Sequence, residues 1–122
     1  MVIDINWPII IITCVFIGFD LITGIIKAVA TSTMDSTKMR TGLWHKIAFL
    51  CAIGLGVICE ISIPLAVFDY AGINISVPLL PFICGFIILT ELTSIIENLG
   101  EINPELKDKK FMNLFFGRKE EK

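Results

Sequence analysis

The sequence predicts an all-α membrane protein with three transmembrane helices, its N-terminus outside and its C-terminus in the cytoplasm. Three observations predict this fold class. The 122 residues are 55% hydrophobic and only 18% charged, which is far from the usual composition of a soluble domain. Three apolar windows are each long enough to cross about 30 Å of hydrocarbon as a helix. The basic residues between and after these windows favour one side of the membrane.

The first predicted span covers residues 7–30. It follows "MVIDINW", which has no Lys or Arg and therefore lacks the charged start of a secretory signal peptide, so we expect it to stay on the mature protein. Polar and small residues recur along the span at helical spacing and form one stripe that avoids lipid. The members of this stripe are Thr13, Asp20, Thr23, Gly24, Lys27 and Thr31.

The second predicted span covers residues 44–68. Pro64 should kink this helix or end it near Ile63, because proline removes a backbone hydrogen bond and clashes with the preceding turn. Ala48, Ala52 and Gly56 are spaced by four and form a seam of small residues at which another helix backbone can come close. Glu60 continues the spacing of the seam, nearer the outer face, and we expect it to pair with neither Asp20 nor Glu91.

The third predicted span covers residues 77–99, with two prolines in its opening turn, a position that tolerates them. Glu91, Ser94 and Asn98 share one face of this helix, and Glu97 flanks them. Residues 1–106 are thus predicted to form one transmembrane domain. Residues 107–122 are predicted to be a charged cytoplasmic tail, either a short helix on the inner leaflet or a solvated segment.

The predicted orientation follows from the flanks of the spans. The linker "TSTMDSTKMRTGLWHK" holds Lys38, Arg40 and Lys46 against the single acid Asp35, and the tail from Glu101 onward holds six Lys or Arg residues. The linker "DYAGINIS" and the N-terminal flank hold none. Positively charged loops stay in the cytoplasm, so all four flanks agree.

Ionisable residues inside the spans are the strongest functional signal, because charge at membrane depth is costly and usually marks function. A rise of about 1.5 Å per residue places Asp20 level with Glu91, and Lys27 level with Glu97 nearer the inner surface. We expect a salt bridge between Lys27 and Glu97. Asp20 and Glu91 are predicted to have no base beside them, so one of them should hold or share a proton, or face water.

Several functional classes are disfavoured by the composition. The net charge is −2 and no basic patch alternates with aromatic residues, so we expect no nucleic-acid partner. The four cysteines show no zinc-binding spacing and are interpreted as small buried hydrophobic residues, and His45 is the only histidine. We therefore expect no catalytic residues, no metal site and no cofactor.

Three blocks of the sequence carry a family resemblance. They are "DLITGIIKA" at residues 20–28, "STKMRTGLWHK" at residues 36–46 and "ELTSIIENLGEINPEL" at residues 91–106. In order and spacing these blocks resemble the toxin-secretion and phage-lysis holins. Thr93, where that family often has Leu, and the tail beyond Leu106 depart from the pattern. The matching positions are Asp20, Thr23, Gly24, Lys27, Ala28, Ser36, Lys38, Gly42, Lys46, Glu91, Ser94, Ile95, Glu97, Asn98, Gly100 and Pro104.

The resemblance implies a small multi-pass protein that accumulates in the bacterial (host) cytoplasmic membrane as a homo-oligomer. It would form lesions through which an endolysin, or an exported toxin, passes without a stable complex. The residues expected to line a pore or a helix interface are Asp20, Thr23, Gly24, Lys27, Glu60, Glu91, Ser94, Glu97 and Asn98.

Two other functions remain open from the sequence. One is a small ion or solute transporter subunit that uses Asp20 and Glu91 as a proton relay, and the other is an antiholin with the same fold. The polar stripes are also compatible with contacts between helices of a monomeric bundle, without a pore.

Overall fold

The computed structural model describes residues 5–63, 72, 78–108, 110, 113 and 114 of the chain. Within these residues it contains three long helices, α1 (Trp7–Ala30), α2 (Ser36–Ile63) and α4 (Leu79–Ile102), and the short 3-10 helix η2 (Pro104–Lys107). All three long helices are long and apolar enough to cross a membrane. The predicted all-α protein with three membrane-spanning helices is confirmed.

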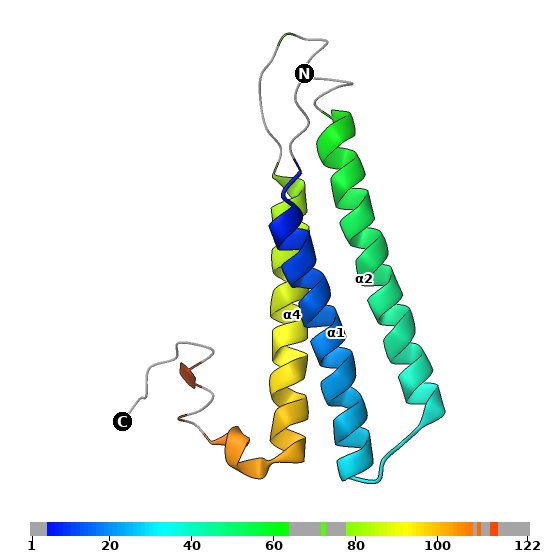
Figure 1. The fold of residues 1–122 in the computed structure, drawn as a ribbon, viewed down its shortest axis with the longest axis vertical. Coiled ribbons are helices and arrows are strands. Elements are labelled where there is room, and N and C mark those ends of the chain that lie inside the picture. Colours follow the sequence, from blue (N-terminus) through cyan, green and yellow to red (C-terminus); the bar gives the residue numbers. More distant parts are fainter. Residues whose placement is uncertain (1–4, 64–71, 73–77, 109, 111–112, 115–122) are drawn as a thin grey trace.

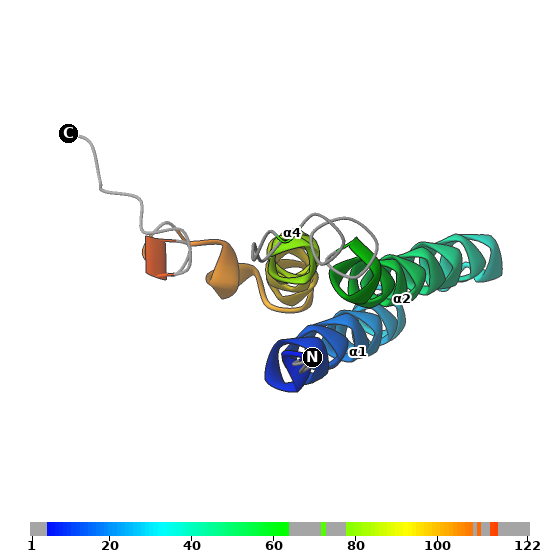
Figure 2. The same ribbon diagram turned by 90° about the horizontal axis from the view of Figure 1, so that it is seen from above.

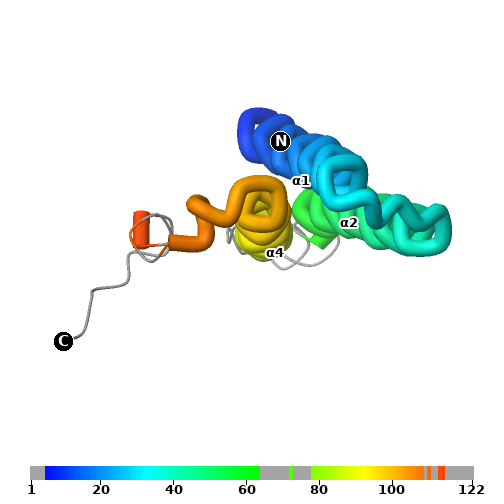
Figure 3. The backbone as a smooth tube through the Cα atoms, turned by 90° about the horizontal axis from the view of Figure 1, so that it is seen from below, coloured from blue at the N-terminus to red at the C-terminus, as the bar shows by residue number. Residues whose placement is uncertain are grey.

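The three long helices lie side by side along the long axis of the molecule (Figure 1). We call the half near Trp7 and Leu79 the upper half, and the half near Ala30, Ser36 and Ile102 the lower half. Helix α4 packs extensively against α1 and less against α2, while α1 and α2 contact each other least. Figures 2 and 3 show that α2 is close to α4 at its upper end and leans away from it toward its lower end.

Local capping explains where α1 and α2 begin. The Asn6 side chain accepts a hydrogen bond from the backbone N–H of Ile9 at 3.2 Å, which caps the start of α1. Asp35 does the same for α2, since its carboxylate accepts from the N–H of Thr37 at 2.9 Å. Helix α2 therefore starts at Ser36, eight residues before the apolar window at Trp44, because a helix continues through polar residues that a hydropathy window excludes.

Helix α4 receives its cap from another helix. Pro78 precedes its first turn and makes no side-chain hydrogen bond to it. Instead, the carboxylate of Glu60 on α2 accepts the N–H of Leu80 at 3.1 Å. Glu60 thus satisfies one of the free N–H groups at the positive end of the helix and ties the upper ends of α2 and α4 together.

One apolar cluster of the core lies mainly in the upper half and draws on all three helices. Gly56 is buried beside it, and a Cβ there would lie 3.0 Å from Cδ1 of Ile83 and 3.3 Å from Cδ1 of Leu80. The absent side chain therefore allows close packing of α2 on α4. The buried members of the apolar cluster are Ile17, Ile53, Leu80, Cys84 and Ile87.

The structure differs from the prediction for two of the cysteines, and parts of the predicted spans and tail lie outside the described residues. Among the cysteines, Cys84 is buried as expected, but Cys14 and Cys51 are exposed on the surface of the helices. Residues 64–68 of the second predicted span, residue 77 of the third and most of the tail beyond residue 108 lie outside the described residues.

Candidate functional site: a charged cluster between three helices

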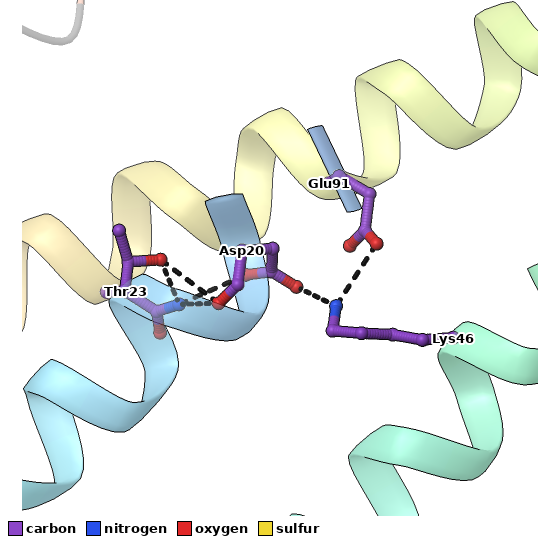
Figure 4. Close-up of polar contacts among 5 residues, drawn as sticks. Asp20, Thr23, Lys46 and Glu91 are labelled. Atoms are coloured by element: carbon purple, nitrogen blue, oxygen red, sulfur yellow. Dashed lines mark hydrogen bonds and ion pairs between the residues drawn. The ribbon is translucent and has the colours of Figure 1, made fainter. Parts of the chain in front are cut away.

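A lysine from α2 bridges the acids of the other two helices (Figure 4). The Nζ of Lys46 lies 2.7 Å from Oδ2 of Asp20 on α1 and 3.1 Å from Oε2 of Glu91 on α4. The three side chains are only 13%, 11% and 3% exposed, respectively. Because an isolated buried charge is costly, each of these shielded charges depends strongly on its oppositely charged partner.

Asp20 is the most fully satisfied member of this cluster. Its Oδ1 accepts a hydrogen bond from Nδ2 of Asn98 at 3.0 Å, while its Oδ2 accepts from Lys46. The same Nδ2 donates to the hydroxyl of Thr23 at 3.0 Å, and that hydroxyl donates to the backbone carbonyl of Asp20 at 3.1 Å. Thr23 and Asn98 are themselves buried, so this network is the main polar contact between α1 and α4.

Helix geometry explains why the three charges meet. Asp20 lies ten residues before the end of α1, Lys46 ten residues after the start of α2, and Glu91 eleven residues before the end of α4. At about 1.5 Å per residue, all three Cα atoms lie roughly 15 Å above the lower ends of their helices. That depth is near the middle of a bilayer core about 30 Å thick.

The prediction that Asp20 and Glu91 have no base beside them is wrong. In the sequence Lys46 lies two residues after Trp44, which indicated a position at the membrane surface. Because α2 starts at Ser36, Lys46 instead lies at the depth of the two acids. With all three groups ionised, the cluster carries one net negative charge.

The expected salt bridge between Lys27 and Glu97 is also wrong. In the described part of the chain these residues form no ion pair with each other, and Glu97 is exposed while Lys27 is half-buried. The depth estimate placed them at one level, but their directions around the two helices are not the same. Glu60 lies near the upper end of the bundle, where its carboxylate caps α4.

The remaining candidate residues are divided between the two halves. Gly24 and Ser94 line the lower half beside the cluster, and a Cβ on Gly24 would meet Nδ2 of Asn98 at an ordinary 3.7 Å. In the seam, Gly56 is buried against α4 and Ala52 is half-buried. Ala48 is exposed, because α2 has already diverged from α4 at that level.

A cavity of about 730 Å³ lies in the lower half, between the diverging helices. All three long helices and the linker before α2 contribute to its wall, and the side chains of Asp20, Lys46 and Glu91 face it. Among the described residues, no group of three or more His, Cys, Asp or Glu side chains could hold a metal ion.

The chain was compared with known proteins. No curated protein and no solved structure matches it. A family model described as the bacteriophage holin family matches residues 3–114, which is nearly the whole chain. This match agrees with the three apolar helices and with the three blocks at residues 20–28, 36–46 and 91–106. The chain therefore belongs to the bacteriophage holin family and is a multi-pass protein of the bacterial cytoplasmic membrane.

Proposed function

We propose that this protein is a holin that oligomerises in the cytoplasmic membrane and forms lesions through which an endolysin, or an exported toxin, leaves the cytosol. Its N-terminus would lie outside and its C-terminus in the cytoplasm. Family membership supports a phage-type holin, and this family permeabilises membranes without enzymatic activity. The lysine-bridged acids at mid-membrane depth are the observation that carries the proposal.

These acids are buried within one copy, but they line a cavity that a single copy leaves partly open. The cluster lines the wall of the cavity, where α2 leans away from α1 and α4. Charged residues at membrane depth face a protein interior or water rather than lipid. Among the described residues, Lys46 is the one base in contact with Asp20 and Glu91, so water in the cavity or a neighbouring subunit would balance the remaining negative charge.

The arrangement of α2 supports a mechanism with two states. The described side-chain polar contacts of α2 with the other helices are two: Glu60 with the start of α4, and Lys46 with the two acids. In the closed state both contacts hold. Above a critical density of subunits, the Lys46 contact would break and α2 would move aside, so that Asp20, Lys27, Glu91 and Glu97 line water.

The alternatives are less well supported. A proton relay through Asp20 and Glu91 was suggested by two acids with no base nearby, and Lys46 now bridges them. An antiholin would share the fold but insert without killing the cell.

Induced expression in a bacterium tests the proposal, with and without a cytosolic endolysin that lacks its own export signal. Abrupt lysis that requires the endolysin is the expected result. A slow leak that is independent of the endolysin would favour a transporter, and normal growth despite membrane insertion would favour an antiholin.

A further inference from the structure

The lower-half cavity is larger than the charged cluster needs, and most of its wall is apolar. Leu21 and Ile25 of α1 face Met39, Leu43 and Phe49 of α2 across it. Its volume of about 730 Å³ is within the range of pockets that enclose small ligands, roughly 300–1,000 Å³. Between two diverging helices in a bilayer, such a space is open to lipid.

The charges at the lower end of this cavity are mainly basic. Lys27 and Lys38 line it, and neither forms an ion pair with another described residue. Lys46, in contrast, is already engaged by Asp20 and Glu91. The one acid near the mouth, Asp35, accepts the N–H of Thr37 at 2.9 Å as the cap of α2.

These two lysines also lie at the right depth for a head group. Lys27 is three residues from the end of α1, and Lys38 is the third residue of α2. A 24-residue helix is about 36 Å long, so its last turn emerges from a hydrocarbon core of about 30 Å. Both ammonium groups can therefore reach the phosphate level, while the apolar wall extends upward into the acyl region.

We propose that this cavity binds an anionic phospholipid of the cytoplasmic leaflet. Its phosphate would lie at Lys27 and Lys38, and one acyl chain would lie along Leu21, Ile25 and Leu43. Basic pockets between transmembrane helices on the cytoplasmic side are a recurring type of site for such lipids. The inference rests on the proposed orientation in the membrane but not on pore formation.

Photo-crosslinking tests the site in the full chain, reconstituted in phosphatidylcholine nanodiscs with a trace of phosphatidylglycerol that carries a photoactivatable acyl chain. Labels on residues 21–25 and 39–43 are expected. The double variant K27Q/K38Q should reduce labelling about 30-fold, since each lysine near an anionic head group contributes roughly fivefold in affinity. The control R40Q/K110Q removes the same charge outside the cavity and should label normally.

A second pair of variants tests the cavity and leaves the lysines unchanged. A Cβ on Gly42 meets nothing within 4 Å, and Gly42 lines the cavity, so G42L would fill the space without a clash. Gly54, on the same helix, has equally open surroundings but does not line the cavity. G42L should abolish most of the labelling, and G54L should not.

Three results would overturn the lipid site: equal labelling by a phosphatidylcholine probe, full labelling of K27Q/K38Q, or contacts between subunits at residues 39–43 in place of lipid. The last result would identify a second copy as the occupant. Cysteine accessibility at introduced positions reports the orientation separately. Endolysin-dependent lysis is a separate assay, so a protein that labels as expected but does not lyse cells would contradict only the proposed function.

Discussion

Helix α2 is held to the other two helices by different kinds of contact in the upper and lower halves of the bundle. In the upper half, Gly56 allows α2 to pack directly on Leu80 and Ile83, and Glu60 caps the start of α4. In the lower half, α2 has moved away from α4, and the long side chain of Lys46 reaches across to Asp20 and Glu91. Close packing fixes α2 in the upper half, whereas in the lower half the charge of Lys46 holds α2 to α1 and α4.

This difference suggests how one small protein can be both stable and switchable. Apolar contacts between helices do not depend on whether a nearby ion pair is formed. The upper end of α2 can therefore stay packed on α4 while its lower end moves. A buried ion pair is sensitive to the loss or replacement of one partner. We infer that movement of α2 would begin at its lower end, and the following variants test this view.

The largest effect is expected for Lys46→Met, which leaves Asp20 and Glu91 buried and adjacent without a base. Removal of one partner of a buried ion pair costs about 3–5 kcal/mol. We expect a lower unfolding temperature in detergent and earlier lysis at equal protein levels. The triple variant D20N/K46M/E91Q should recover much of the stability, because no charge then remains unpaired. Wild-type stability and timing for K46M would contradict the role assigned to the lysine.

Gly56→Leu should have the next largest effect, and on stability rather than timing. Its side chain would meet Ile83 and Leu80 and force α2 away from α4. Overpacking of this kind costs about 1–3 kcal/mol. Gly54→Leu is the matched control, since a Cβ there has nothing within 4 Å. Equal unfolding temperatures for the two variants would show that the upper half is not tightly packed.

Asp20→Asn and Glu91→Gln each remove one carboxylate but keep a polar group of similar size. Because Lys46 retains the other acid, each change should cost only about 0.6–2 kcal/mol and shift the time of lysis. The effect of D20N should be the larger, since Asp20 is 2.7 Å from Lys46 and also accepts from Asn98. A larger effect of E91Q, or unchanged timing for both variants at normal protein levels, would count against the cluster as the switch.

The smallest effect is expected for Glu60→Gln. The amide oxygen can still accept the N–H of Leu80, but the negative charge at the positive end of α4 is lost, which costs about 0.3–1 kcal/mol. Hydrogen exchange at the Leu80 amide is the appropriate measurement, and it should be modestly faster. Asp20 and Lys46 are remote from this cap, so the lysis time should stay unchanged.

The sequence by itself determined the three membrane-spanning helices, the family and the separate position of Glu60. These features depend on the length of apolar runs, on spacing along one helix and on the order of motifs in the chain. All three can be determined from the sequence without knowing how the helices pack. The first span was predicted from its apolar run with the bounds that α1 has, because here the apolar run and the helix begin and end together. The predicted orientation and the pore-lining role of the polar residues stay predictions.

Only the tertiary structure decided which charges meet. Asp20 and Glu91 were predicted to lack a base because Lys46 follows Trp44 and was counted as part of the linker. Its depth depends on the true start of α2 at Ser36, and its partners depend on how far each helix is rotated and tilted against the others. Hydropathy measures only how long an apolar run is. It therefore predicts neither that Asp35 caps a helix nor the direction in which a side chain points.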